Sequence, residues 1–300
     1  MEGTGRRWTR SMAAVLGTSA FFALSGIAVA RLSSESGSTT ISPQQNGTAT
    51  AKCGSGSTAV AGGFAAPGLD PSAETGPAIL TYASTRPADG KWQASGHNFN
   101  NPSPAPARGV PGAGPLVAYA YCDKHDPSVA VRSKSTTVDA GGHASLTPKC
   151  PRGSEAVSGG FQSDAPTPGT EELTNFAYTS KRSGDRAWKI AVLNPDMSSH
   201  KVQAFAYCEK HAPNLVSRSA SKKIDPLNTA TITAKCPKGS KAFSGGYEST
   251  FEQSGMGLDS SVAFTSKRSG DGSWKVSAIG VVLEGSTTPQ TEKAIAYCAT

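Results

Sequence analysis

The sequence has little charge and no sustained helical pattern. Charged residues make up only 17% of its 300 residues and aromatic residues 7%, whereas glycine (33) and proline (20) are abundant. No stretch repeats apolar residues at the spacing of an amphipathic helix. These features argue against a helical bundle and favour turn-rich β structure. Because the apolar residues, 37% of the chain, are evenly spread, we expect several small cores rather than one large core.

The patterns that mark common catalytic and metal sites are also missing. The chain has no Gly-x-Ser-x-Gly, no His-x-x-x-His and no Cys-x-x-Cys. Its histidines are His97, His125, His143, His200 and His211. Of these, only His125 and His211 occupy equivalent places, where a solvated linker histidine is the simplest interpretation. We therefore predict no catalytic residue, no metal site and no cofactor, and a protein that is not an enzyme.

Basic residues are in mild excess but are not concentrated. The formal net charge is +7, and no run of five or more basic residues occurs. Nucleic-acid binding needs a localised basic patch or stripe. The pattern predicts a solvated basic surface and no nucleic-acid partner.

The chain contains one sequence motif that occurs three times. The fullest copy starts at Lys149-Cys150-Pro151-Arg152-Gly153-Ser154, continues to Gly159-Gly160-Phe161 and closes at Ala206-Tyr207-Cys208. The third copy spans 235–298 with Gly245-Gly246-Tyr247, and the first spans 52–122 with Gly62-Gly63-Phe64. Two glycines within a strand mark a bulge or the close approach of another backbone. A phosphate-binding loop would need a helix after them, and none is predicted.

All six cysteines lie at equivalent positions of this repeat, one near the start and one at the end of each copy. In an exported chain this pattern predicts disulfides rather than metal ligands. The repeat selects one pairing out of fifteen: Cys53–Cys122, Cys150–Cys208 and Cys236–Cys298. Closing a loop of this size contributes about 4 kcal/mol to the stability of a module with a small core.

The first thirty residues resemble an export signal. Arg6, Arg7 and Arg10 precede an uncharged run from Met12 to Ala30 that ends in a small-x-small cleavage site. The run is longer than a usual signal core and nearly long enough to span a bilayer. We expect residues 1–30 to be a cleaved signal or, alternatively, a retained anchor through residues 12–30. In either case the remainder lies outside the cytoplasm, extracellular or at the cell surface.

After a flexible lead-in (31–37), the repeat predicts three tandem modules at 38–124, 128–210 and 215–300. Each should open with a hairpin, whose turns fall at Asn46-Gly47, Asp139–Gly142 and Asp225–Asn228. Strand and turn signals suggest about six strands per module. The expected fold is all-β, with three disulfide-closed, β-sandwich-like modules. Short linkers with proline and charge suggest semi-rigid beads on a chain.

A second shared block combines arginine, aspartate and tryptophan at a strand–turn–strand. Arginine and tryptophan are six residues apart in every copy. The candidate binding residues are Arg86, Asp89 and Trp92, Arg182, Asp185 and Trp188, and Arg268, Asp271 and Trp274. An indole face with directed arginine and aspartate hydrogen bonds suits a sugar ring or a cation. The structural alternative is that the tryptophan is the core residue of each module.

The arginine-led signal, the richness in alanine, glycine and serine, and the Lys-Cys-Pro-x-Gly-Ser…Gly-Gly-aromatic repeats resemble uncharacterised exported proteins of high-GC Gram-positive bacteria. The resemblance covers all three modules and implies no catalytic residue. Copy one departs from it with Gly54 where the others have proline.

Three functions follow as hypotheses. The first is a secreted or surface-tethered multivalent binding protein for envelope glycan or a surface protein, with one weak site per module. The second is a structural or assembly component of the envelope or an extracellular particle. The third, the least favoured, is a hydrolase or a protease inhibitor. The sequence leaves the oligomeric state open.

Overall fold

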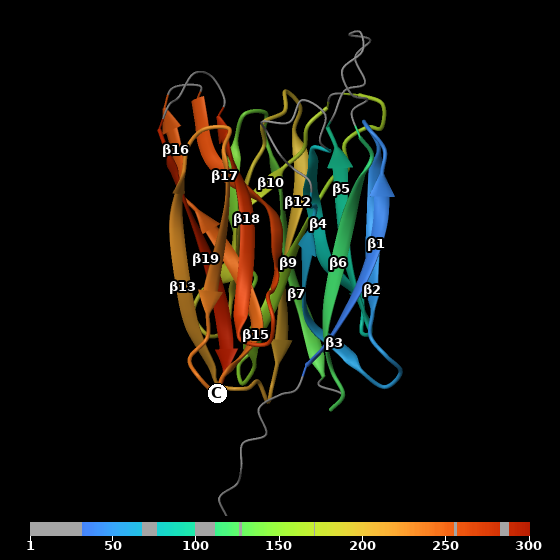
Figure 1. The fold of residues 1–300 in the computed structure, drawn as a ribbon, viewed down its shortest axis with the longest axis vertical. Helices are drawn as coiled ribbons and strands as arrows, with labels where there is room; N and C mark the ends of the chain where they lie inside the picture. Colours follow the sequence, from blue (N-terminus) through green and yellow to red (C-terminus); the bar gives the residue numbers. More distant parts are fainter. Residues whose placement is uncertain are drawn as a thin grey trace, which may run out of the picture.

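The fold is built from β-strands throughout the described part of the chain (Figure 1). The computed structural model describes residues 32–67, 77–99, 112–125, 128–170, 172–254, 257–282 and 288–300. The predicted all-β class with three disulfide-bonded modules is confirmed. The predicted signal or anchor at 1–30 lies outside the described residues, as do residues 100–111 of module 1.

The strands follow the three copies of the repeat. Module 1 contains β1 (Ser33–Ile41), β2 (Asn46–Lys52), β3 (Thr58–Ala65), β4 (Ile79–Ala88), β5 (Lys91–Asn98) and β6 (Gly114–Asp123). Module 2 contains β7 (Val129–Val138), β8 (His143–Leu146), β9 (Glu155–Ser163), β10 (Phe176–Arg182), β11 (Trp188–Leu193) and β12 (His200–Glu209). Module 3 contains β13 (Leu215–Ile224), β14 (Thr229–Lys235), β15 (Lys241–Ser249), β16 (Phe251–Ser254), β17 (Gly257–Arg268), β18 (Ser273–Val282) and β19 (Gln290–Ala299).

Each module is a sandwich of two halves of three strands, and in module 3 the short strand β16 adds a fourth strand to one half by pairing with β17. In module 1 the halves are β1-β6-β3 and β2-β5-β4, and modules 2 and 3 repeat the arrangement. The first two strands of a module therefore lie in different halves, and the predicted opening hairpins are wrong. Asn46 begins β2, and the chain crosses between the halves just before it. The reason is that β1 pairs with the distant closing strand β6 over its whole length.

The predicted flexible lead-in at 31–37 is also largely strand. Strand β1 begins at Ser33, which pairs with Cys122 in β6. Its small polar residues alternate between half-buried and exposed positions, a pattern typical of an edge strand. A polar composition therefore did not prevent pairing, because the backbone of β6 supplied the hydrogen-bond partners.

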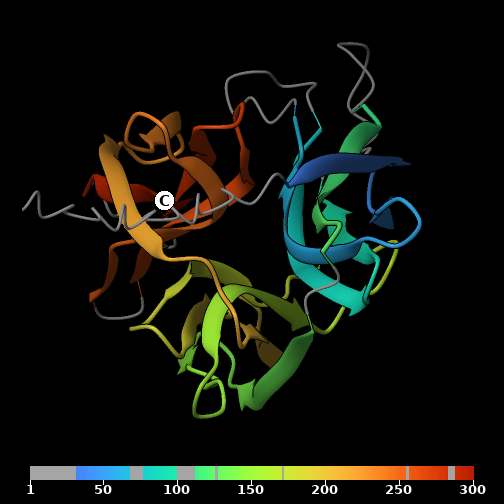
Figure 2. The same ribbon diagram turned by 90° about the horizontal axis from the view of Figure 1, so that it is seen from below.

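The modules are not separate beads, because every sheet crosses from one module into the next. Strand β4 pairs with β9, β10 pairs with β15, and β17 pairs with β3. Three long sheets result, each with one half from each of two modules. Viewed from one end, the modules lie around a common axis, with module 1 in blue through teal to green, module 2 in green to yellow and module 3 in orange to red (Figure 2). We call these contacts seams 1/2, 2/3 and 3/1.

The paired glycines make the seams possible. A Cβ on the first glycine of each pair would lie 2.1–2.2 Å from the tryptophan of its own module, at Gly62, Gly159 and Gly245. A Cβ on the second would lie within 2.1–2.3 Å of a serine carbonyl oxygen in the neighbouring module, at Gly63, Gly160 and Gly246. Both distances are shorter than van der Waals contact allows. A bulge also precedes each pair, so the structural interpretation of the motif is confirmed.

The aromatic residue after each glycine pair lies where the modules meet. Phe64 packs edge to face against Phe161 and Tyr247, with ring centroids 6.4 Å apart in both pairs. The bulged residues Val60, Val157 and Phe243 form a second apolar cluster together with Ala299. Apolar side chains from all three modules are therefore buried against one another, which couples the modules energetically.

All three predicted disulfides are present. They join Cys53 to Cys122, Cys150 to Cys208 and Cys236 to Cys298, with Cα–Cα distances of 5.6–5.7 Å. Each connects the segment before the glycine-containing strand to the closing strand of the same module. Three disulfides indicate that the chain folds in an oxidising environment.

Candidate functional site

The three tryptophans are core residues rather than ligand platforms. Trp92, Trp188 and Trp274 are each 1% exposed. Each indole Nε1 donates a hydrogen bond of 3.0 Å to a serine of its own module, at Ser84, Ser180 and Ser266. The indole therefore has its polar atom satisfied and its faces covered. The proposed role of these indoles in binding sugar or cations is wrong, and the structural alternative holds.

Each tryptophan also packs across a seam. Its ring lies edge to face against a tyrosine of the neighbouring module, in the pairs Trp92–Tyr207, Trp188–Tyr297 and Trp274–Tyr121. The same tyrosine hydroxyls accept a 2.7 Å hydrogen bond from the backbone N–H of Arg86, Arg182 and Arg268. We call this unit of arginine, tryptophan, serine and tyrosine the seam clamp. Burial raises the pKa of all three phenols, so the hydroxyls stay neutral.

The arginine head groups are buried within the clamps. Their side chains are 3%, 9% and 7% exposed for Arg86, Arg182 and Arg268. These arginine head groups are therefore not exposed at the hairpin tips, as a binding role for them would require. Arg86 bonds Asp89 at 2.7 Å and Arg268 bonds Asp271 at 2.8 Å. These ion pairs fix the hairpin instead of presenting a free cation.

The three aspartates support the hairpins through their backbone as well. The carbonyl oxygens of Asp89, Asp185 and Asp271 accept hydrogen bonds of 2.6–2.8 Å from the N–H of the alanine six residues after the first cysteine of each module. Their carboxylates are largely exposed. The structure thus brings all nine predicted residues together in groups of three. Each group joins a hairpin to its own module and to the next one.

A groove lies at seam 2/3, between modules 2 and 3. The tip of the β10–β11 hairpin and the strands β13, β19 and β15 line about 360 Å³ of open space there. We call this the seam groove. It is lined by Lys181, Arg182, Gly184, Asp185, Leu215, Ser217, Ser219, Glu248, Lys293, Ile295 and Tyr297.

A line of three alternating charges crosses the seam groove. Glu248 forms ion pairs with Lys181 of module 2 and, at 3.3 Å, with Lys293 of module 3. Burial raises the pKa of the Glu248 carboxyl, but the hydrogen bonds and positive charges of the two lysines hold it below its ordinary value. All three side chains are about a quarter to two-fifths exposed, so their remaining donors and acceptors can reach a ligand.

The other seams have different residues at these three positions. The registers of the paired strands place Thr85, Gln162 and Gln203 at seam 1/2. They place Lys267, Ala65 and Val117 at seam 3/1. There the Lys267 ammonium instead donates to the Tyr119 hydroxyl at 2.8 Å. Within the described residues, the charged triad is therefore specific to seam 2/3, whereas the clamps occur at all three seams.

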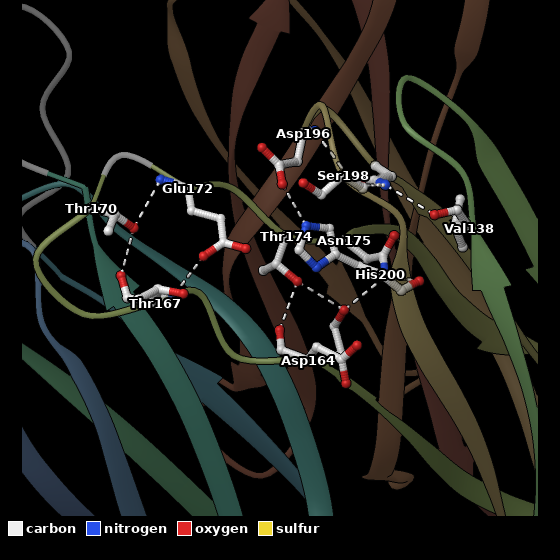
Figure 3. A network of polar contacts seen from close by, with 12 residues as sticks. Val138, Asp164, Thr167, Thr170, Glu172, Thr174, Asn175, Asp196, Ser198 and His200 are labelled. Carbon is white, nitrogen blue, oxygen red and sulfur yellow. Dashed lines mark hydrogen bonds and ion pairs between the residues drawn. The ribbon is translucent and has the colours of Figure 1, made fainter.

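A second polar cluster lies at one end of module 2 (Figure 3). Glu172, Asp196 and His200 each place one possible metal-ligating atom within 4.8 Å of the others. His200 is the first residue of β12 and bonds Asp196 at 2.6 Å. Burial raises the pKa of Asp196, but the bond to His200 and the backbone N–H groups of Met197 and Ser198 lower it overall.

Sequence reasoning missed both polar groups. His200 was one of the scattered histidines, and Asp196 four residues before it was the only local signal. Glu172 joins them through a loop whose path depends on tertiary contacts. Glu248 and Lys293 could have been noticed as charges at repeat positions where the other copies carry none, whereas Lys181 has a charged counterpart in Lys267.

The described residues contain no helix long and apolar enough to cross a membrane. Comparison with known proteins gives no further guide to the site, because no protein-family model and no curated protein sequence matches the chain.

Proposed function

We propose that the protein is a non-enzymatic binding protein that acts outside the cytoplasm and holds a segment of envelope or extracellular glycan in the seam groove. The observation that carries this proposal is the charged triad crossing that groove. It departs from a repeat that is otherwise structural. Residues shared by all three copies build the clamps, so a residue set found at one seam is available for a different task.

The chemistry of the seam groove suits a hydroxyl-rich ligand. Lys181 and Lys293 supply donors, Glu248 supplies acceptors, and Ser217 and Ser219 can do either. Leu215 and Ile295 add an apolar strip along which the carbon face of a sugar can pack. The groove's open shape suits a chain that passes through it better than a small molecule that must be enclosed.

The same charges argue for binding without catalysis. A general acid or base at neutral pH needs a pKa shifted towards 7. The pKa of the Glu248 carboxyl is shifted the other way, and each of its oxygens contacts a lysine. The three disulfides and the arginine-led N-terminal sequence support action in an extracellular or cell-surface location.

The proposal predicts one site per chain rather than the three that the repeat suggests. The test is pull-down of residues 31–300 by purified cell wall, followed by a glycan array. Glu248→Gln and Lys293→Gln introduce the residues that module 2 carries at the same places. Each should weaken binding at least tenfold without changing the melting temperature by more than a few degrees.

The matched control is Gln203→Lys, which changes the same position at seam 1/2 and should leave binding unchanged. If Glu248→Gln and Lys293→Gln bind as well as the unchanged protein, or if the unchanged protein retains no glycan, the groove is not a glycan site. In the second case a surface protein or an assembly role takes precedence. The clamps at all three seams favour that structural role, because they make the molecule rigid without needing a ligand.

A further inference from the structure

The cluster of Glu172, Asp196 and His200 combines side chains from three separate segments. Glu172 comes from the loop after β9, Asp196 from the turn after β11, and His200 from the start of β12. Figure 3 shows the Glu172 carboxylate and the Asp196 carboxylate approaching the His200 ring from two sides. We propose that these three side chains bind one divalent transition-metal ion, with Zn²⁺ as the ion that fits them best.

Two of the ligands are already held in place by other contacts. The amide of Asn194 is buried and donates to the carbonyl oxygens of Val138, Asp139 and Ser198. Its own oxygen accepts a 3.1 Å hydrogen bond from the backbone N–H of Asp196. His200 is only 5% exposed, which restricts the orientation of its ring. A site with fixed ligands loses little conformational entropy when the ion binds.

The third ligand has one oxygen available. Glu172 uses Oε2 to accept a 3.0 Å hydrogen bond from the backbone N–H of Thr167. Its other carboxylate oxygen faces the imidazole ring in Figure 3. The carboxylate is thus oriented by its own loop and directed towards the other two ligands. This second contact matches the way in which metal-binding carboxylates are usually supported.

The ligand set distinguishes between ions. One imidazole nitrogen and two carboxylates suit Zn²⁺, which takes three protein ligands and leaves a fourth position for water. Ca²⁺ needs six to eight oxygen ligands, and Mg²⁺ prefers an octahedron of oxygens. The other two modules lack this histidine. At the position in the closing strand that corresponds to His200, module 1 has Gly114 and module 3 has Gln290.

Binding of the metal ion would connect the loop that carries Glu172 to seam 1/2. The loop that carries Glu172 lies against module 1, where Gly169 donates to the carbonyl of Gln44 at 2.8 Å. Asn46 of module 1 also donates to the carbonyl of Pro166 at 2.7 Å. An ion held between this loop and β12 would restrain both partners of seam 1/2. The expected consequence is a higher melting temperature in the presence of the ion.

The test uses residues 31–300 without a histidine tag, stripped with a chelator and titrated with Zn²⁺ by calorimetry at pH 7. We expect one ion per chain and a melting temperature that rises with Zn²⁺ concentration. Glu172→Gln and Asp196→Asn keep the side-chain shapes and should each weaken binding at least tenfold. His211→Gln, which removes an exposed histidine from the linker after module 2, should leave binding unchanged.

Three outcomes would overturn the proposal. One is the absence of a 1:1 binding event. Another is Zn²⁺ binding that persists at full strength in both carboxylate variants. The third is tighter binding of Ca²⁺ than of Zn²⁺ at the same site. Circular dichroism of each variant before titration ensures that lost binding is not lost folding.

Discussion

The hydroxyl oxygen of Tyr207 accepts a 2.7 Å hydrogen bond from the backbone N–H of Arg86, a residue of a different module. The same bond joins Tyr297 to Arg182 and Tyr121 to Arg268. Going round the ring, module 1 donates to module 2, module 2 to module 3, and module 3 to module 1. The tyrosine directly before the closing cysteine of each copy, a fully regular feature of the repeat, thus serves contacts between modules.

Replacing a clamp tyrosine with phenylalanine should destabilise the whole protein. Tyr207→Phe leaves the ring in place but deprives the buried N–H of Arg86 of its acceptor, which costs about 1–3 kcal/mol. Urea unfolding followed by tryptophan fluorescence measures the change. Tyr119→Phe is the matched control, because its hydroxyl accepts from the Lys267 side chain rather than from a buried backbone group. Equal effects of the two substitutions would contradict the role of the clamp.

The second glycine of each pair should tolerate no side chain. In Gly246→Ala the new Cβ would lie 2.1 Å from the carbonyl oxygen of Ser180, so strands β10 and β15 would have to separate. We expect a loss of about 3 kcal/mol or more, at the upper end of overpacking effects, or failure to fold. Gly272→Ala is the control, because a Cβ there has no atom within 4 Å. Thermal unfolding that is the same for both variants would show that the seam can widen.

The buried acid Glu292 should make stability depend on pH. It is 0% exposed, and burial raises the pKa of its carboxyl from 4.5 to about 8, against the opposing hydrogen bond from Ser261. Between these two values the folded protein holds a proton that the unfolded chain releases. The free energy of unfolding therefore falls as the pH rises from about 4.5 to 8, then levels off. The change is on the order of a few kcal/mol.

Glu292→Val introduces the residue that module 2 carries at this place, Val202, and should remove that part of the pH dependence. The pKa of Glu209 is also raised, to about 7, by burial and by the nearby Asp123. Comparing the variant with the unchanged protein separates the contribution of Glu292 from that of Glu209. Urea titrations at pH 5 and pH 8 provide the measurement. If the variant's loss of stability between these pH values equals that of the unchanged protein, Glu292 does not titrate as described.

Removing one disulfide should weaken all three modules together. Cys150 and Cys208 are 58 residues apart, and opening a loop of this size costs about 4 kcal/mol. Because β9 and β10 each pair with a strand of a neighbouring module, the loss should lower the stability of the whole chain. The double variant Cys150→Ala/Cys208→Ala should retain one unfolding transition at a lower temperature. A new, separate transition for module 2 alone would contradict this expectation.

Local signals were enough to predict part of what lies within a module, although not the pairing of its first two strands. The cysteine pairs followed from two cysteines per repeat, and the turn between Arg182 and Trp188 followed from its Ser-Gly-Asp composition. Partners at the seams were not predictable in this way. Nothing in the sequence near Ser84 indicates that it lies opposite Phe161, because the pairing joins residues from different modules and depends on three modules closing into a ring.

The candidate binding residues show the same limit. Arginine, aspartate and tryptophan at a hairpin tip have the chemistry of a sugar site and also that of a packed core. Their burial decides between the two, and that burial comes from Tyr207, Tyr297 and Tyr121 of the neighbouring modules. For the same reason, residues 128–210 are not a suitable fragment for testing binding, since both sheets of module 2 are completed by other modules.

The central claim is that the three modules form one cooperative unit. Differential scanning calorimetry of residues 31–300 with intact disulfides tests it most directly. Shared sheets and three clamps predict a single transition whose calorimetric enthalpy equals the van't Hoff enthalpy. Two or three resolved transitions, or a van't Hoff enthalpy near one third of the calorimetric value, would show that the modules unfold independently and would contradict the account.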